Sequence, residues 1–138
     1  SSGGSANGGV LTTLVGAGDV IISDRLNHAS IIDGCRLAKA SGASLVVTAH
    51  RDTRAVENAL VTRTTKYALV ITDGLFSMDG VLAPLPELSR LARDYGAWLM
   101  VDDAHSFGAV GDRDKRVVRN VHGWTNAGPA LMVARLAP

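Results

Sequence analysis

The sequence is poor in cysteine, proline and aromatic residues. Its 138 residues include one cysteine, four prolines and only 4% aromatic side chains. The single cysteine, Cys35, has no partner for an internal disulfide, which agrees with a reducing compartment. Cys35 lies in an apolar pattern with helical spacing, so we interpret it as a small core residue rather than a nucleophile. With so few aromatics, a core must be built from Val, Leu, Ile and Ala, the usual residues of buried parallel sheets and their covering helices.

Long apolar runs and clustered charge are also missing. No uninterrupted apolar segment approaches the roughly 20 residues that cross a bilayer, and the first residues do not resemble a signal peptide. The formal net charge is +1, and the basic residues are scattered among acidic ones, so no nucleic-acid-binding face is indicated. We therefore expect a cytoplasmic protein with neither a membrane nor a nucleic-acid partner. Because the chain begins without methionine, we also expect a portion of a longer protein.

Short apolar runs alternate with segments of helical spacing. The runs at 19–23, 44–48, 67–73 and 97–103 predict strands that are buried on both faces. Three intervening segments predict helices. Ser30 is the expected N-cap of the first, Asp52 or Thr53 of the second, and Pro86 and Gly96 mark the ends of the third. The alternation predicts an α/β fold with three αβα layers and a mostly parallel sheet, in which 74–86 is a long turn-rich connection.

Polar residues follow three of these strands, at the edge where open α/β sheets bind ligands. They are His28 after the first strand, Asp73, Ser77 and Asp79 after the third, and Asp102, Asp103 and His105 after the fourth. Residues such as His28, Asp73, Ser77 and Asp79 are usually capping or turn residues, and on local pattern alone we interpret these four in that way. Asp102 differs, because a carboxylate at the buried end of an apolar strand requires a cation or a hydrogen-bond donor. The pair Asp102 and His105 is therefore the predicted functional pair.

Three kinds of chemistry compete for this pair. The Mg²⁺-binding strand of a P-loop nucleotidase requires the motif G-x-x-x-x-G-K-[ST], which the sequence lacks. A metal site made by Asp102, His105 and His28 lacks a supporting His or Cys spacing, so we predict no metal. A cofactor with a cationic ring nitrogen and a phosphate fits better, because Asp102 would hold that nitrogen protonated and the glycine-rich residues 1–9 precede a predicted helix that would bind the phosphate. Pyridoxal phosphate meets both demands and offers a flat ring for an imidazole to lie on.

Four stretches together resemble the α-oxoamine synthases, a family of fold-type I pyridoxal-phosphate enzymes. They span 1–40, 50–60, 70–88 and 95–111, and the motifs "DGLFSMDG" and "VDDAHSFG" carry most of the likeness. The resemblance implies the aspartate aminotransferase-like large domain, with 1–111 as a part of it and 112–138 as a divergent tail. The segment "NHASIIDGCRL" is most similar to the branch that acts in biotin biosynthesis. Glycine C-acetyltransferases, 5-aminolevulinate synthases and serine palmitoyltransferases share much of the pattern.

The resemblance implies a role for each candidate residue. Asp102 would bind the pyridine nitrogen, and His28 would lie on the ring face. His105 and Ser77, the catalytic candidates, would bind the phenolic oxygen. The backbone of Ser2, Gly3 and Gly4 would bind the phosphate. Asp103 has no implied cofactor contact. The implied reaction condenses a pimeloyl-type acyl-CoA with L-alanine and releases CO₂. The implied assembly is a homodimer.

The lysine that holds the cofactor in this family is not recognisable. The chain contains Lys39, Lys66 and Lys115, and none lies in the Ser/Thr-x-Lys segment that the resemblance leads us to expect. Lys39 and Lys66 are expected to be solvated. Two hypotheses follow: the chain is a front portion of such an acyltransferase, or it is a truncated product that binds pyridoxal phosphate without turnover.

Overall fold

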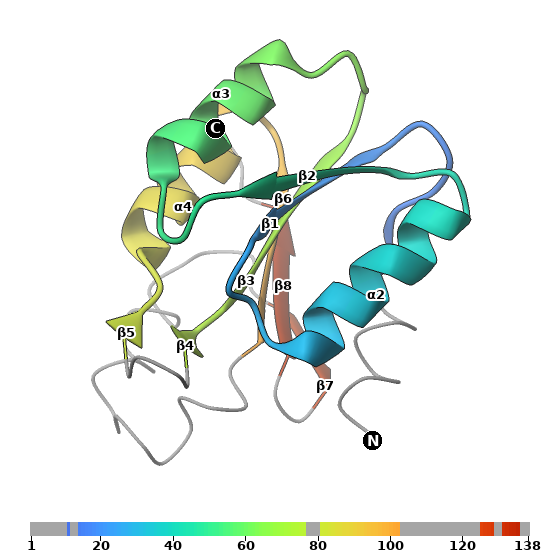
Figure 1. Ribbon diagram of the computed structural model, residues 1–138. Coiled ribbons are helices and arrows are strands. Elements are labelled where there is room, and N and C mark those ends of the chain that lie inside the picture. The colour runs from blue at the N-terminus through green and yellow to red at the C-terminus, as the bar shows by residue number, and fades with distance from the viewer. Residues whose placement is uncertain (1–10, 12–13, 77–80, 103–124, 129–130, 136–138) are drawn as a thin grey trace.

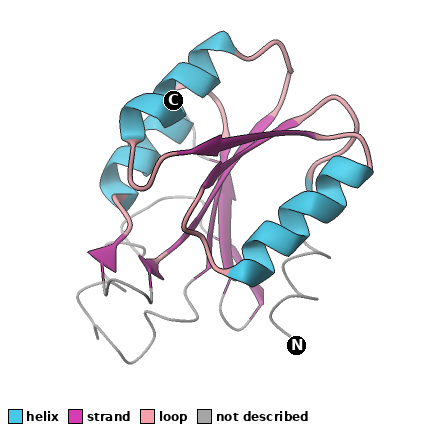
Figure 2. Cartoon of the chain, in the orientation of Figure 1, coloured by secondary structure: helices cyan, strands magenta, loops and turns pink. Residues whose placement is uncertain are grey.

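The described residues form a six-stranded mixed sheet covered by helices on both faces (Figure 1, Figure 2), and a separate two-stranded ladder. The computed structural model describes residues 11, 14–76, 81–102, 125–128 and 131–135. The strands of the sheet are β1 (Val20–Asp24), β2 (Ser44–Thr48), β3 (Ala68–Asp73), β6 (Trp98–Asp102), β7 (Thr125–Gly128) and β8 (Leu131–Arg135). The helices are α2 (Ala29–Ala40), α3 (Thr53–Thr62) and α4 (Leu85–Asp94).

The strand order β2-β1-β3-β6-β8-β7 confirms the predicted fold class. The first four strands are parallel, and β8 and β7 add antiparallel pairs at the far side of β6. Each parallel neighbour follows a helical crossover, as expected for α/β units. Because the strands are parallel, the carboxyl ends of β1, β3 and β6 meet at one edge of the sheet.

Alternate residues of each central strand pack on opposite faces, so the core has two layers. Ile22, Val70 and Leu99 pack against α3 and α4, together with Leu60 and Leu88. The residues in between pack on the other face: Ile21, Leu69, Ile71 and Met100 lie with Ile31, Cys35 and Ala38 of α2. Cys35 is 1% exposed, as its interpretation as a core residue requires. Burial raises the pKa of its thiol to about 11, which keeps the sulfur protonated and unreactive.

The prediction that every strand is buried on both faces is wrong for β2. Val46 and Val47 are exposed, and only Thr48 of this strand is buried. The reason is position: β2 pairs with β1 alone and lies at the edge of the described sheet. By contrast, all six residues of β3 are buried, because β1 and β6 flank it.

The cap predicted for the first helix is also wrong. α2 begins at Ala29, and its N-cap is His28, whose ring Nδ1 accepts a hydrogen bond from the Ser30 backbone N–H at 3.1 Å. Ser30 therefore lies in the first turn instead of capping it. On the outer side of this helix, Leu37 is 56% exposed.

The other two helices start as predicted. The Asp52 Oδ1 atom accepts from the Ala55 backbone N–H at 3.0 Å, so Asp52 is the N-cap of α3. In α4, Pro86 lies in the first turn, where its missing N–H costs no intrahelical bond. Gly96 follows the helix with a φ of +64°, a conformation that favours glycine.

The connection between β3 and α4 contains a short antiparallel ladder that the sequence did not predict. β4 (Leu75–Phe76) pairs with β5 (Val81–Leu82). Ser77 and Asp79 fall between them and lie outside the described residues. Within the described part of the chain, no helix is long and apolar enough to cross a membrane.

Candidate active site

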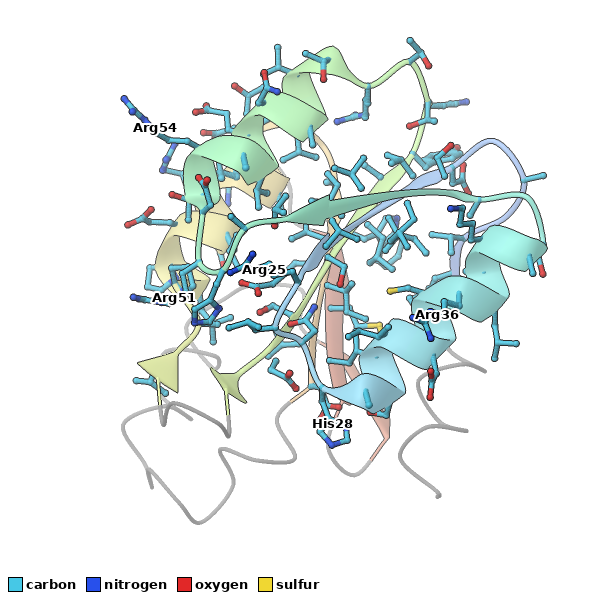
Figure 3. All side chains as sticks on the ribbon, viewed as in Figure 1. Arg25, His28, Arg36, Arg51 and Arg54 are labelled. Atoms are coloured by element: carbon cyan, nitrogen blue, oxygen red, sulfur yellow. The ribbon has the colours of Figure 1, made fainter. Side chains whose placement is uncertain are left out.

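Three adjacent strands each end in an aspartate at the carboxyl edge of the sheet. These residues are Asp24 on β1, Asp73 on β3 and Asp102 on β6. Asp73 and Asp102 are direct partners in the parallel register, and the Gly74 backbone N–H donates to the Asp102 carbonyl oxygen at 2.8 Å. Figure 3 places His28 at the start of α2, at this same edge. The edge therefore brings together two of the predicted site residues, His28 and Asp102.

Asp73 is the most buried carboxyl group of this edge. It is 2% exposed, and its Oδ2 atom accepts from the His28 backbone N–H at 2.6 Å. The Oδ1 atom is buried and has no hydrogen-bond partner among the described residues. Our interpretation of Asp73 as an ordinary turn residue is wrong, because the β3 ladder with Asp102 extends to this position.

The environment of Asp73 favours its uncharged form. Its pKa is raised to about 7, first because burial removes water from the carboxylate and then because the Asp102 carboxylate is close. The hydrogen bond from the His28 N–H acts in the opposite direction and lowers the pKa. The Asp73 carboxyl group therefore keeps its proton to a higher pH than an ordinary aspartate does.

Asn27 connects the loop after β1 to the end of β3. Its side chain is buried, and Nδ2 donates to the Ser23 Oγ at 2.9 Å and to the Ile71 carbonyl oxygen at 3.0 Å. Its Oδ1 accepts from the Asp73 backbone N–H at 3.1 Å. The sequence analysis missed Asn27. The one available signal was its place between a strand end and His28, which does not distinguish a buried amide from an exposed loop residue.

Asp24 connects the loops after β1 and β2. Its Oδ1 accepts from the Leu26 backbone N–H at 2.8 Å and lies 3.2 Å from His50 Nδ1, and its Oδ2 accepts from the Arg51 N–H at 2.7 Å. Arg51, labelled in Figure 3, has a φ of +57°, which is unfavourable for a residue with a side chain. The hydrogen bond to Asp24 holds this conformation and fixes the loop that precedes α3.

The remaining predicted site residues lie outside the described part of the chain. They are Ser2, Gly3, Gly4, Ser77 and His105, together with Asp103, for which no cofactor role was predicted. Their roles stay predictions. His28 caps α2 in place of the predicted Ser30, and its ring Nδ1 also lies 3.0 Å from the Ser30 Oγ.

The two described lysines lie at the opposite edge of the sheet. Lys66 precedes β3, a strand of six residues that spans about 20 Å at 3.3 Å per residue. Lys39 lies in the last turn of α2, a helix of 12 residues whose other end carries His28. Both are exposed, as predicted. Neither side chain can reach the carboxyl edge from these positions.

The chemistry of the edge fits a group that carries a positive charge. Asp73 and Asp102 place two buried carboxyl groups side by side, and the Asp73 Oδ1 still lacks a donor within the described residues. A protonated ring nitrogen at this point would pair with the Asp102 carboxyl group, which is 7% exposed. No group of three or more His, Cys, Asp or Glu suited to a metal ion occurs among the residues that were described.

The fold and this edge define a pyridoxal-phosphate-dependent transferase of the three-layer α/β type. The family model of the class I and II aminotransferases matches residues 1–135, and the chain belongs to this family. The match continues past residue 111, where the sequence analysis placed a domain boundary, and that boundary stays a prediction.

The similar proteins of known name are much longer than this chain. The 8-amino-7-oxononanoate synthase of Methylococcus capsulatus is 56% identical over 111 residues, which are 80% of this chain and 28% of that protein. The corresponding enzyme of Mycobacterium sp. (strain KMS) is 44% identical over 99% of this chain and 35% of its own length. The chain thus spans about a third of these relatives.

Solved structures of α-oxoamine synthases share the fold. A serine palmitoyltransferase from S. paucimobilis, solved with a bound PLP–myriocin aldimine, has a TM-score of 0.76 and 29% identity over 99% of this chain and 37% of its own. The serine palmitoyltransferase of Sphingomonas wittichii has a TM-score of 0.72 and 28% identity over 97% of this chain and 36% of its own. The resemblance to α-oxoamine synthases is confirmed, and with it pyridoxal phosphate as the cofactor of the family.

Proposed function

We propose that this chain is the front portion of the cofactor-binding domain of a pyridoxal-phosphate-dependent acyltransferase of biotin biosynthesis. The enzyme condenses a pimeloyl thioester with L-alanine and releases CO₂. The observation that carries the proposal is the buried Asp102 at the carboxyl edge, in a chain 56% identical to a protein named 8-amino-7-oxononanoate synthase. The other named relatives at 50–54% identity carry the same activity in their names, which supports this branch over others.

Asp102 is the residue that we assign to the cofactor's ring nitrogen. When bound, pyridoxal phosphate supplies an electron sink for the α-carbon of the amino acid, and this sink depends on a protonated ring nitrogen. The Asp102 carboxylate holds that proton through a charge-assisted hydrogen bond.

His28 is the residue that we assign to the face of the cofactor ring. The backbone at His28 is fixed by the start of α2 and by the bond to Asp73. Its Nδ1 accepts from Ser30, so the ring orientation is fixed as well. A planar imidazole held in this way can stack on an aromatic ring without first losing conformational freedom.

The remaining roles come from the family resemblance. We propose that His105 and Ser77 bind the phenolic oxygen and hold or donate the proton there. The backbone N–H groups of Ser2, Gly3 and Gly4, which precede a helical segment, bind the phosphate. We further propose that the enzyme acts in the cytoplasm as a homodimer on acyl-CoA and amino-acid substrates.

The test is a substrate panel with the longest natural gene product that contains this sequence, loaded with pyridoxal phosphate. We expect release of free CoA from pimeloyl-CoA with L-alanine at least about tenfold faster than with glycine or L-serine, because one misfit group in a pocket costs about 1–3 kcal/mol. Acetyl-CoA, succinyl-CoA and palmitoyl-CoA test the other branches of the family. A preference for one of those pairs would replace the proposed substrates.

A second candidate function is binding of the cofactor without turnover. It is favoured by the position of Lys39 and Lys66, which lie away from the carboxyl edge. The 138-residue chain alone would then bind pyridoxal phosphate weakly, and replacement of its three lysines by alanine would leave the affinity unchanged. Synthase activity from this chain alone would disprove this second function.

A further inference from the structure

The loop after β1 and the end of β3 are joined by reciprocal hydrogen bonds. The side chain of Asn27 accepts from the Asp73 N–H, and the side chain of Asp73 accepts from the His28 N–H. The residues in these pairs are 46 and 45 positions apart in the sequence. We call this pair of contacts the Asn27–Asp73 clamp.

The clamp acts on the residue that starts α2. The backbone N–H of an N-cap residue has no acceptor within its own helix, so another group must bind it. In α2 that group is the Asp73 carboxyl, at 2.6 Å. The position of the His28 backbone is thereby fixed relative to β3, whose neighbour in register carries Asp102.

A buried carboxyl group has a high desolvation cost for a contact that only stabilises the fold. Asp73 is 2% exposed beside a second carboxyl group, and burial raises its pKa to about 7. An uncharged acceptor would serve the His28 N–H at a lower desolvation cost. In addition, Asn27 already ties the loop to β3 through bonds to the Ile71 carbonyl and the Asp73 N–H. Stability alone therefore does not account for Asp73.

We propose that Asp73 is a positioning residue of the cofactor site, which sets the place of the His28 ring relative to the Asp102 carboxyl group by accepting the His28 N–H. This inference rests on the proposed function. It assigns Asp73 no contact with substrate. Its effect on the cofactor passes through His28 and through the carboxyl pair at the ends of β3 and β6.

The test compares Asp73→Ala, which removes the acceptor of the His28 N–H, with Asp33→Ala in the longest natural gene product. Asp33 is an exposed carboxyl group on α2 that pairs only with Arg36 among the described residues, at 3.8 Å, so it controls for the loss of one carboxyl group near the same helix. The readouts are the dissociation constant of pyridoxal phosphate and the visible circular dichroism band per bound cofactor. The band depends on how the ring is held, and a merely structural role would leave it unchanged in the loaded fraction.

We expect Asp73→Ala to weaken cofactor binding about tenfold, because the His28 N–H then lacks its acceptor, and to change the sign or intensity of the band. Asp33→Ala should match the unaltered protein in both readouts. If the unaltered protein shows the band and Asp73→Ala reproduces it with the same affinity, the inference is overturned while the proposed function stands. If the unaltered protein binds no cofactor, both fall.

A measurement on the unaltered protein covers the case in which Asp73→Ala does not fold. Hydrogen exchange of the His28 amide, followed by mass spectrometry of peptides across residues 25–32, reports directly on the bond to Asp73. We expect exchange at least about a hundredfold slower than in an unstructured peptide, since the amide opens only when the local structure does. Exchange at the unstructured rate would overturn the inference.

Discussion

Asp102 is the single residue that we assign to the ring nitrogen of the cofactor. Its replacement therefore gives the most direct prediction at the scale of single residues. Asp102→Asn keeps the shape but removes the carboxylate that we propose holds the cofactor's ring nitrogen protonated. We expect kcat of the complete gene product to fall at least about a hundredfold, the upper range for one hydrogen bond to a charged group. Steady-state kinetics measure this, with Asp94→Asn on α4 as an exposed control. A kcat within about twofold of the unaltered enzyme contradicts the assignment.

Asp73 gives a second prediction at this scale, for the dependence of stability on pH. Its pKa is about 7 in the folded protein against 3.8 for an ordinary aspartate, so the folded protein retains a proton that the unfolded chain releases. The stabilisation is complete below about pH 4 and is lost as the pH rises through 7. The free energy of unfolding should fall by up to about 1.4 kcal/mol per pH unit in this window.

Urea denaturation of the complete gene product between pH 4 and pH 8 measures this slope. Asp73→Asn removes the titrating group, so its slope should be smaller by the contribution of one proton. An identical slope in the variant would show that other groups dominate.

At the scale of elements, we predict that the start of the α3 helix depends on one capping side chain. Asp52 Oδ1 accepts from the Ala55 N–H, and among the described residues this is the only side-chain cap at the start of α3. Asp52→Ala should lower the free energy of unfolding by about 1 kcal/mol. Urea denaturation checks this value, and Asp33→Ala, an exposed site in the interior of α2, is the matched control. Equal loss in both variants would rule out a capping effect.

Elements were predictable from the sequence where local pattern decides them. The apolar runs gave β3 and β6 within a residue, and Asp52 and Pro86 marked the starts of α3 and α4. The start of α2 was not predictable, because His28 is held by Asp73 from 45 residues away, and a local pattern favours serine as the cap. The exposure of β2 was missed for a similar reason: its apolar run does not reveal which strand lies at an edge.

The residues of the candidate site were also predictable only where a local pattern decides them. Asp102 was predictable, because a carboxylate at the end of an apolar strand is unusual on local grounds. Asp73 also ends an apolar run, but neither its contact with His28 nor the buried amide of Asn27 was predictable, since both depend on a partner on another element. What the sequence lacked was the register between β3 and β6, which sets Asp73 beside Asp102.

At the scale of the whole molecule, the exposed edge at β2 governs how the 138-residue chain behaves in solution. Val47 is 57% exposed on this strand, and an apolar edge invites pairing between chains. Val47→Lys should slow aggregation of the chain at neutral pH at least about threefold, because a charge on an edge strand opposes such pairing. Light scattering measures it.

The control for this effect is Val61→Lys on α3. Val61 is 58% exposed, so it loses the same apolar surface and gains the same charge without lying on a strand. If Val61→Lys slows aggregation equally, net charge rather than the strand edge is responsible.

The Asn27–Asp73 clamp also sets an order of events during synthesis. His28 leaves the ribosome long before Asp73, so the loop that carries it cannot acquire its native bonds until β3 has been made and has paired with β1. The entropic cost of bringing these distant residues together must be met before the contact contributes any stabilisation. The first helix can therefore form early, while the place of the histidine at its tip is decided only when the centre of the sheet closes.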